Sequence, residues 1–156
     1  MAIDIGAAAI DRASETSTEY TYINKENPAN ASGIINSVEV WTHTNITEAK
    51  VGIFYTTNGD TLKCRSAATI GAVTAGAKRT FEVSLAVESG DYIGIFTDSG
   101  QLDWNTGGAG VWSKSGNHCV VDEETSYTAE GGVGSLYGTG VEFIYGAATF
   151  LSLIHI

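Results

Sequence analysis

The residues of this chain best suited to ligand chemistry lie on either side of a glycine-rich stretch. Trp104 and Trp112 flank residues 107–110, and Asp103 and Asn105 lie beside the first of these tryptophans. An indole offers a flat apolar face on which a sugar ring stacks, and neighbouring carboxylate or amide groups orient the sugar. The four residues therefore form a candidate carbohydrate-binding site. Two alternatives remain open for the indoles, namely burial in the core and burial at a subunit interface.

Two aspartates close to this group are candidate calcium ligands. Asp98 and Asp103 bracket a short loop, and hard cations such as Ca²⁺ take oxygen ligands. The spacing Asp-x-Asp-x-Asp-Gly that marks a calcium-binding loop is absent from the sequence. Calcium is thus the one ion that the sequence suggests, and no other cofactor is expected.

His118 and Cys119 are adjacent, which raises the question of a nucleophile with its general base. Neighbouring side chains on a strand point to opposite faces, so an extended backbone separates the two groups. Only a turn at residues 116–117 would bring them together. The acidic run at residues 122–124 is expected to be a solvated turn. No catalytic residue is therefore expected.

The cysteines bear on the redox state of the chain. Cys64 and Cys119 are far apart in sequence, and a bridge between them would stabilise the fold by about 4 kcal/mol. Residues 1–5 lack the basic region of a Sec-type signal peptide, which favours free, buried thiols over a disulfide.

The charge of the chain argues against two classes of partner. Eighteen acidic residues outnumber eight scattered basic residues, and the net charge is −10. Nucleic acid and anionic membrane surfaces both require clustered bases, so neither is an expected partner. The 19 glycines and single proline suit a fold with many tight turns.

Alternation of apolar and polar residues identifies the elements that must position these groups. The run from Phe81 to Glu88 alternates strictly, which is typical of a half-buried strand. Residues 92–96 are apolar on both faces, so this strand should be central. Asn58-Gly59 predicts a hairpin with a type I′ turn. Further strands are expected near residues 2–10, 17–23, 34–43, 51–55, 61–66, 117–121, 125–129, 133–138 and 141–147.

About nine or ten short strands separated by turns favour an all-β fold, a two-sheet antiparallel β-sandwich that is jelly-roll-like. Residues 1–150 are expected to form a single domain. Residues 151–156 (Leu-Ser-Leu-Ile-His-Ile) look like the translation of a sequencing adapter. They are interpreted as a non-native tail, so the natural C-terminus beyond residue 150 is unknown.

Three segments carry a resemblance to known sequences: NKENPANASGIINSVEVW, VTAGAKRTFEVSLAVESGDYIGIF and GGVGSLYGTG. Together they resemble uncharacterised proteins of phage-rich and environmental metagenomes, over most of residues 3–140. The Gly90-Asp91 turn between two strands is also similar to a turn in jelly-roll heads of the C1q and tumour-necrosis-factor type. This resemblance implies a β-sandwich and transfers no catalytic residue.

These observations favour a non-enzymatic structural or adhesion subunit of a virion or other extracellular assembly. Its partner would be copies of itself, as a trimer or larger homo-oligomer, and release would not use a Sec signal; otherwise the protein would be cytoplasmic. The alternative is a carbohydrate-binding module that uses an aromatic platform. A small glycosidase or lyase is a third and less favoured hypothesis.

Overall fold

The computed structural model describes residues 2–143, which contain no helix and fold into antiparallel β-sheets. The fold class expected from the sequence is confirmed. The expected tail at residues 151–156 lies outside the described residues, as does most of the strand expected at 141–147.

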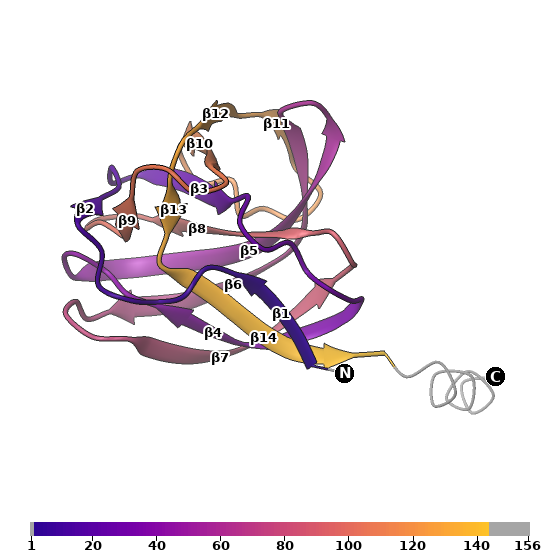
Figure 1. Ribbon diagram of the computed structural model, residues 1–156, viewed down its shortest axis with the longest axis horizontal. Helices are drawn as coiled ribbons and strands as arrows, with labels where there is room; N and C mark the ends of the chain where they lie inside the picture. The colour runs from indigo at the N-terminus through magenta and orange to yellow at the C-terminus, as the bar shows by residue number, and fades with distance from the viewer. Residues whose placement is uncertain (1, 144–156) are drawn as a thin grey trace.

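The smaller of the two main sheets has four strands in the order β1-β14-β4-β7. It lies along the lower part of the view in Figure 1. Its strands are β1 (Ala2–Gly6), β14 (Leu136–Glu142), β4 (Gly33–Val40) and β7 (Arg79–Val87). The alternating run from Phe81 lies in β7 and behaves as expected, because Leu85 and Val87 are buried while Glu82 and Ala86 are exposed.

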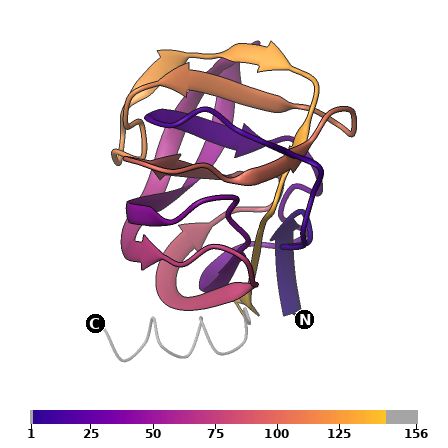
Figure 2. The ribbon, with the colours of Figure 1, turned by 90° about the vertical axis from the view of Figure 1, so that its left-hand side faces the viewer.

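The larger sheet has seven strands in the order β11-β6-β5-β8-β3-β10-β12. Its two edge strands, β11 and β12, follow each other in the chain with only Tyr127 between them, so the sheet curls into a nearly closed barrel. Figure 2 shows the late strands of the chain lying above β3 at one end of the molecule. The strands are β3 (Tyr20–Asn24), β5 (Ile46–Asn58), β6 (Thr61–Val73), β8 (Tyr92–Thr97), β10 (Val111–Ser115), β11 (Glu124–Ser126) and β12 (Thr128–Glu130).

Two hydrophobic cores lie on the two faces of the larger sheet. The first core fills the space between the two main sheets and contains Ile53, Ile93 and Ile95. The second core lies inside the curl and contains Ile23, Phe54, Leu62, Cys64, Trp112, Cys119 and Tyr127. Burying one such large side chain contributes about 1.5–3 kcal/mol. Strand β8 contributes to both cores, so its expected central position is confirmed.

A third, small sheet crosses one end of the molecule and carries part of the candidate site. Its order is β13-β9-β2, with β13 (Val133–Gly134), β9 (Asp103–Asn105) and β2 (Ser14–Glu15). β2 is not among the strands expected from the sequence. These strands are two or three residues long, so they are too short to show a periodic pattern.

Two expectations from the sequence were wrong, one about a turn and one about a strand. The β5–β6 hairpin forms, but Asn58 pairs with Thr61 and leaves Gly59-Asp60 as the loop. Only Gly59 has a positive φ (62°), which fits a type II′ turn rather than type I′. Residues 117–121 are not a strand but part of the loop that joins β10 to β11.

Candidate binding surface

Trp112 belongs to the second core and offers no face to a ligand. The residue is 5% exposed, and its Nε1 donates a hydrogen bond of 2.9 Å to Asp60 Oδ1 in the β5–β6 hairpin. Its indole makes an edge contact with Tyr92, with ring centroids 4.9 Å apart. Lys25 Nζ lies 4.5 Å from the centroid of the indole. Of the roles left open by the sequence, core burial is the one that the structure gives to Trp112.

Trp104 lies on the other side of β3 from Trp112. Trp112 is opposite Ile23 in the sheet, whereas Trp104 contacts the preceding residue, Tyr22, at a centroid distance of 6.2 Å. Consecutive residues of a strand face opposite sides, so the two indoles cannot form one platform. The expected pairing of Trp104 with Trp112 is therefore wrong.

Trp104 instead belongs to a row of aromatic side chains. Tyr20 and Tyr22 are two residues apart on β3 and share one face, with ring centroids 5.8 Å apart at 29°. Trp104 continues the row next to Tyr22, and all three side chains are partly exposed. We call Tyr20, Tyr22 and Trp104 the aromatic row.

Asp103 and Asn105, the neighbours of Trp104 in β9, are both hydrogen-bonded to Arg12. Asp103 is 1% exposed, and its Oδ2 accepts a hydrogen bond of 2.9 Å from the backbone N–H of Arg12. Asn105 Oδ1 accepts a 3.2 Å bond from Arg12 Nη1, and Arg12 Nε donates to Ser135 Oγ at 2.8 Å. These bonds tie β9 to the segments before β2 and before β14. Asp103 is thus buried behind the surface, whereas Asn105 is partly exposed beside Trp104.

The carboxyl group of Asp103 is electrostatically unusual. Burial raises its pKa above the ordinary value, and the nearby Asp11 carboxyl raises it further. Asp103 Oδ1 has no hydrogen-bond partner and lies 3.4 Å from His43 Nδ1. His43 is half exposed, and its Nε2 lies 3.9 Å from Glu15 Oε2.

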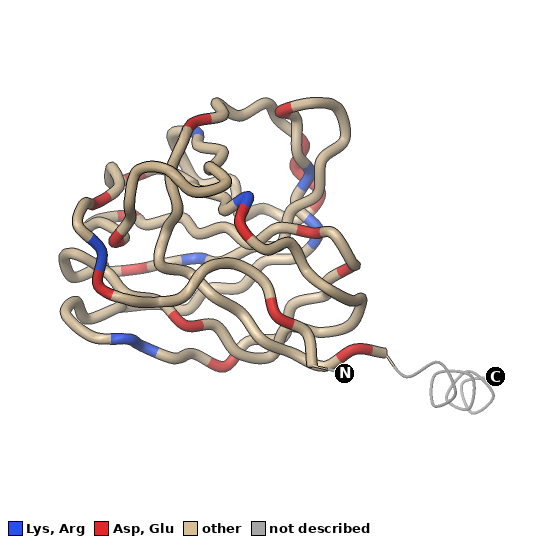
Figure 3. The backbone as a smooth tube through the Cα atoms, in the orientation of Figure 1, with Lys and Arg blue, Asp and Glu red and all other residues tan. Residues whose placement is uncertain are grey.

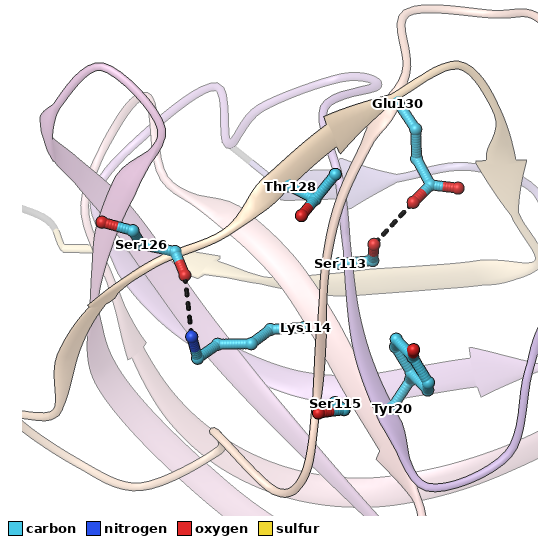
Figure 4. A pocket seen from close by; sticks show the side chains of 7 residues that line it. All are labelled: Tyr20, Ser113, Lys114, Ser115, Ser126, Thr128 and Glu130. Atoms are coloured by element: carbon cyan, nitrogen blue, oxygen red, sulfur yellow. Dashed lines mark hydrogen bonds between the residues drawn. The ribbon is translucent and has the colours of Figure 1, made fainter.

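A polar groove adjoins the aromatic row. Its volume is about 400 Å³, and Tyr20 lies in both the row and the groove. The register explains this, because Tyr20 is opposite Ser115, Tyr22 is opposite Ser113, and Ser113 is opposite Thr128. The hydroxyl groove, as we call it, is lined by Tyr20, Ser113, Lys114, Ser115, Ser126, Thr128 and Glu130 (Figure 4).

Two hydrogen bonds organise the groove. Ser113 Oγ donates to Glu130 Oε2 at 2.6 Å, and Lys114 Nζ donates to the backbone carbonyl of Ser126 at 3.2 Å (Figure 4). The groove residues other than Tyr20 come from β10, β11 and β12. The sequence predicted one strand at 125–129, where the structure has β11 and β12 on either side of Tyr127. The available signal was the alternation of serine in β10 beside the two tyrosines of β3, which becomes meaningful only once these strands are known to pair.

The other candidates from the sequence do not join this surface. Asp98 Oδ1 accepts bonds from the backbone of Glu48 at 2.8 Å and from Ser99 Oγ at 3.3 Å. Asp98 and Asp103 share none of these hydrogen-bond partners. Residues 2–143 contain no group of three or more His, Cys, Asp or Glu side chains arranged to hold a metal ion. The calcium hypothesis therefore gains no support from this part of the chain.

His118 and Cys119 lie in a loop, not on the strand that was expected, yet the structure gives them separate surroundings. His118 Nδ1 is 2.6 Å from Glu123 Oε1, and His118 Nε2 is 2.8 Å from the carbonyl oxygen of Ser115. The Cys119 thiol is buried, donates to the carbonyl of Lys50 at 3.6 Å, and has a pKa raised by that burial. Both cysteines are free in the structure.

Comparison with known proteins gives no relative: no family model, no curated protein and no solved structure matches the chain. Within residues 2–143, no helix has the length and apolar character needed to cross a membrane.

Proposed function

We propose that the protein is a non-enzymatic binding module that recognises a glycan through the aromatic row and the hydroxyl groove. It would serve as an adhesion component of a virion or another extracellular assembly. One observation supports this most strongly: partly exposed aromatic rings from β3 and β9 adjoin a groove with five hydroxyl-bearing side chains from β3, β10, β11 and β12. This revises the platform suggested by the sequence, since Tyr20 and Tyr22 take the place of Trp112 beside Trp104.

The chemistry of the surface suits a sugar. Aromatic faces bury the apolar C–H face of a pyranose ring, while hydroxyl groups both donate and accept hydrogen bonds, as sugar hydroxyls do. The volume of about 400 Å³ is within the usual range for small-molecule sites. Pairing to β3 and β12 fixes the backbone of β10, so the serines of the groove are held in register before any ligand arrives.

Affinity gel electrophoresis on a panel of soluble polysaccharides tests this function. We expect wild-type protein to be retarded by at least one polysaccharide, and Tyr20→Ala to lose at least tenfold in affinity, equivalent to about 1.4 kcal/mol. Tyr137→Ala is the matched control, because Tyr137 is also partly exposed but lies on β14 of the other main sheet. Circular dichroism and thermal unfolding verify that both variants are folded. Equal retention of wild type and Tyr20→Ala would rule out the proposed surface.

Self-assembly as a structural subunit is a second candidate, favoured by a different observation. Ile10 is 49% exposed and lines a hollow of about 360 Å³ with Ala8, Ala9, Tyr137 and the ion pair of Glu39 and Lys78, away from the hydroxyl groove. An exposed isoleucine at the edge of such a hollow offers an apolar contact to a second copy of the chain. Light scattering after size exclusion should then show a trimer or larger assembly that Ile10→Ser dissociates. A monomeric wild type at micromolar concentration counts against this candidate.

A further inference from the structure

The charges around the proposed glycan surface bear on the class of glycan that it could take. Glu130 lies in the hydroxyl groove, and its carboxylate accepts the hydrogen bond of Ser113. Glu19 is exposed immediately before Tyr20. Glu15 pairs with Asp103 and lies near His43, on the side of β9 away from the Trp104 side chain, so it is not part of this surface. Glu130 is thus the carboxylate that lies in the groove itself. Figure 3 shows how sparse the basic residues are among the acidic ones over the molecule as a whole.

The basic groups that border this surface already have bonding partners. Lys114 Nζ donates to the carbonyl of Ser126. The guanidinium of Arg12 donates to Ser135, Asn105 and the carbonyl of Ala8, and it is needed there to hold β9. Lys114 uses one of its three N–H donors in its bond to Ser126, so its charge offsets the charge of Glu130 within the groove. The net charge of −10 of the chain as a whole then opposes the approach of an anionic polymer.

The uncharged part of the groove favours a ligand that both gives and takes hydrogen bonds. Serine, threonine and tyrosine hydroxyls do both, whereas carboxylate and sulfate groups only accept. A neutral sugar can donate to Glu130 and exchange bonds with Ser115 and Thr128. An anionic sugar would lose the first of these interactions and would be repelled by the charge of Glu130.

We infer that the ligand is a neutral polysaccharide, and that uronic-acid-containing and sulfated polysaccharides are disfavoured by the Glu130 carboxylate and by the net charge of −10. This inference rests on the proposed glycan-binding function. It goes further by assigning Glu130 a role in specificity: the residue accepts hydrogen bonds from neutral sugars and repels anionic ones.

The test compares neutral with acidic polysaccharides at low ionic strength. Affinity electrophoresis is run with galactomannan, arabinoxylan and mixed-linkage β-glucan in one arm, and with alginate, polygalacturonate and chondroitin sulfate in the other. The affinity for at least one neutral polymer should be at least tenfold higher than the affinity for any acidic polymer, a difference of about 1.4 kcal/mol. Raising the salt concentration should narrow the gap, because screening weakens the repulsion.

A charge-neutral variant ties the effect to Glu130. Glu130→Gln keeps an acceptor for Ser113, so retention by the neutral polymer should change little while retention by the acidic polymers rises. Glu48→Gln is the matched control, since Glu48 is an exposed carboxylate on β5 that does not line the groove, and it should change neither arm.

The outcomes distinguish the proposed glycan-binding function from the specificity inferred for it. Acidic polymers retained as tightly as neutral ones, with retention lost in Tyr20→Ala, would overturn the inference and leave the proposed function standing. Equal effects of Glu130→Gln and Glu48→Gln would overturn the role given to Glu130. Retention by neither arm would overturn the proposed function, and the inference with it.

Discussion

Replacing Gly132 by alanine should push the Trp104 indole out of the aromatic row. A Cβ atom at this position would lie 2.2 Å from Cζ3 and 2.5 Å from Cε3 of Trp104, where 3.4 Å is the lower limit of ordinary contact. The indole must therefore shift by roughly an ångström. Overpacking of this kind costs about 1–3 kcal/mol. The φ of +142° at Gly132 adds backbone strain, because side-chain-bearing residues rarely adopt it.

Gly76→Ala separates the strain from the steric effect. Gly76 also has a positive φ (+89°), but no atom lies within 4 Å of the position that a Cβ would take there, so the control carries strain alone. In a domain of this size 1 kcal/mol shifts Tm by roughly 2–4 °C, so Gly132→Ala should melt about 2–12 °C below Gly76→Ala.

Thermal unfolding followed by tryptophan fluorescence and near-ultraviolet circular dichroism measures both the loss of stability and the altered environment of Trp104. Affinity electrophoresis of the folded variants should show weaker glycan retention for Gly132→Ala only. If Gly132→Ala melts and binds like Gly76→Ala, Gly132 does not support Trp104 in the way described, and the aromatic row loses its third member.

Three other predictions follow from burial. Iodoacetamide at pH 7.5 should label neither Cys64 nor Cys119 until denaturant is added. Burial raises the pKa of Cys64 to about 11 and also raises the pKa of Cys119, so neither thiol is ionised in the native protein. Rapid labelling of the native protein, measured by mass spectrometry, would contradict this. Asp103→Asn should gain unfolding free energy relative to wild type as pH rises from 3 to 7, measured by urea titration. Because the pKa of Asp103 is raised in the folded protein, its stabilising contribution is complete below the unfolded-state pKa and is lost as pH rises through the folded-state pKa. A difference in unfolding free energy between Asp103→Asn and wild type that does not change with pH would refute this prediction. Trp112→Phe removes the bond to Asp60 and should cost about 1–3 kcal/mol of stability with unchanged glycan affinity, whereas a loss of affinity in the folded variant would restore Trp112 to the site.

The sequence predicted the sheet class because alternation is a local property. The run from Phe81 in β7 shows this alternation clearly, and residues 92–96 showed by their two apolar faces that β8 must be covered on both sides. The β5–β6 hairpin was also predicted, with its turn misplaced by one residue. Turn register depends on cross-strand pairs such as Asn58 with Thr61, which the dipeptide Asn-Gly does not specify.

The candidate site was only partly predictable because it depends on how distant strands pair. Trp104 and Trp112 look equivalent in sequence, yet the curl of the larger sheet buries one and leaves the other partly exposed. Tyr127 is the single residue that links β11 to β12, the two edge strands of the curled sheet. A link of one residue leaves no distinctive pattern in the sequence. Tyr20 was recognised as a strand residue, but its place beside Ser115 required the β3–β10 register.

The central claim is that the surface made of the aromatic row and the hydroxyl groove binds a glycan. Its most direct test is a titration of ¹⁵N-labelled protein with an oligosaccharide cut from a polysaccharide that retains the protein, followed by amide chemical shifts. We expect the shifts to concentrate at Tyr20, Trp104, Ser113 and Thr128, with little change at Tyr137 on the other sheet. Shifts centred on β14 or on the loop around Cys119, with the groove unaffected, would contradict the claim.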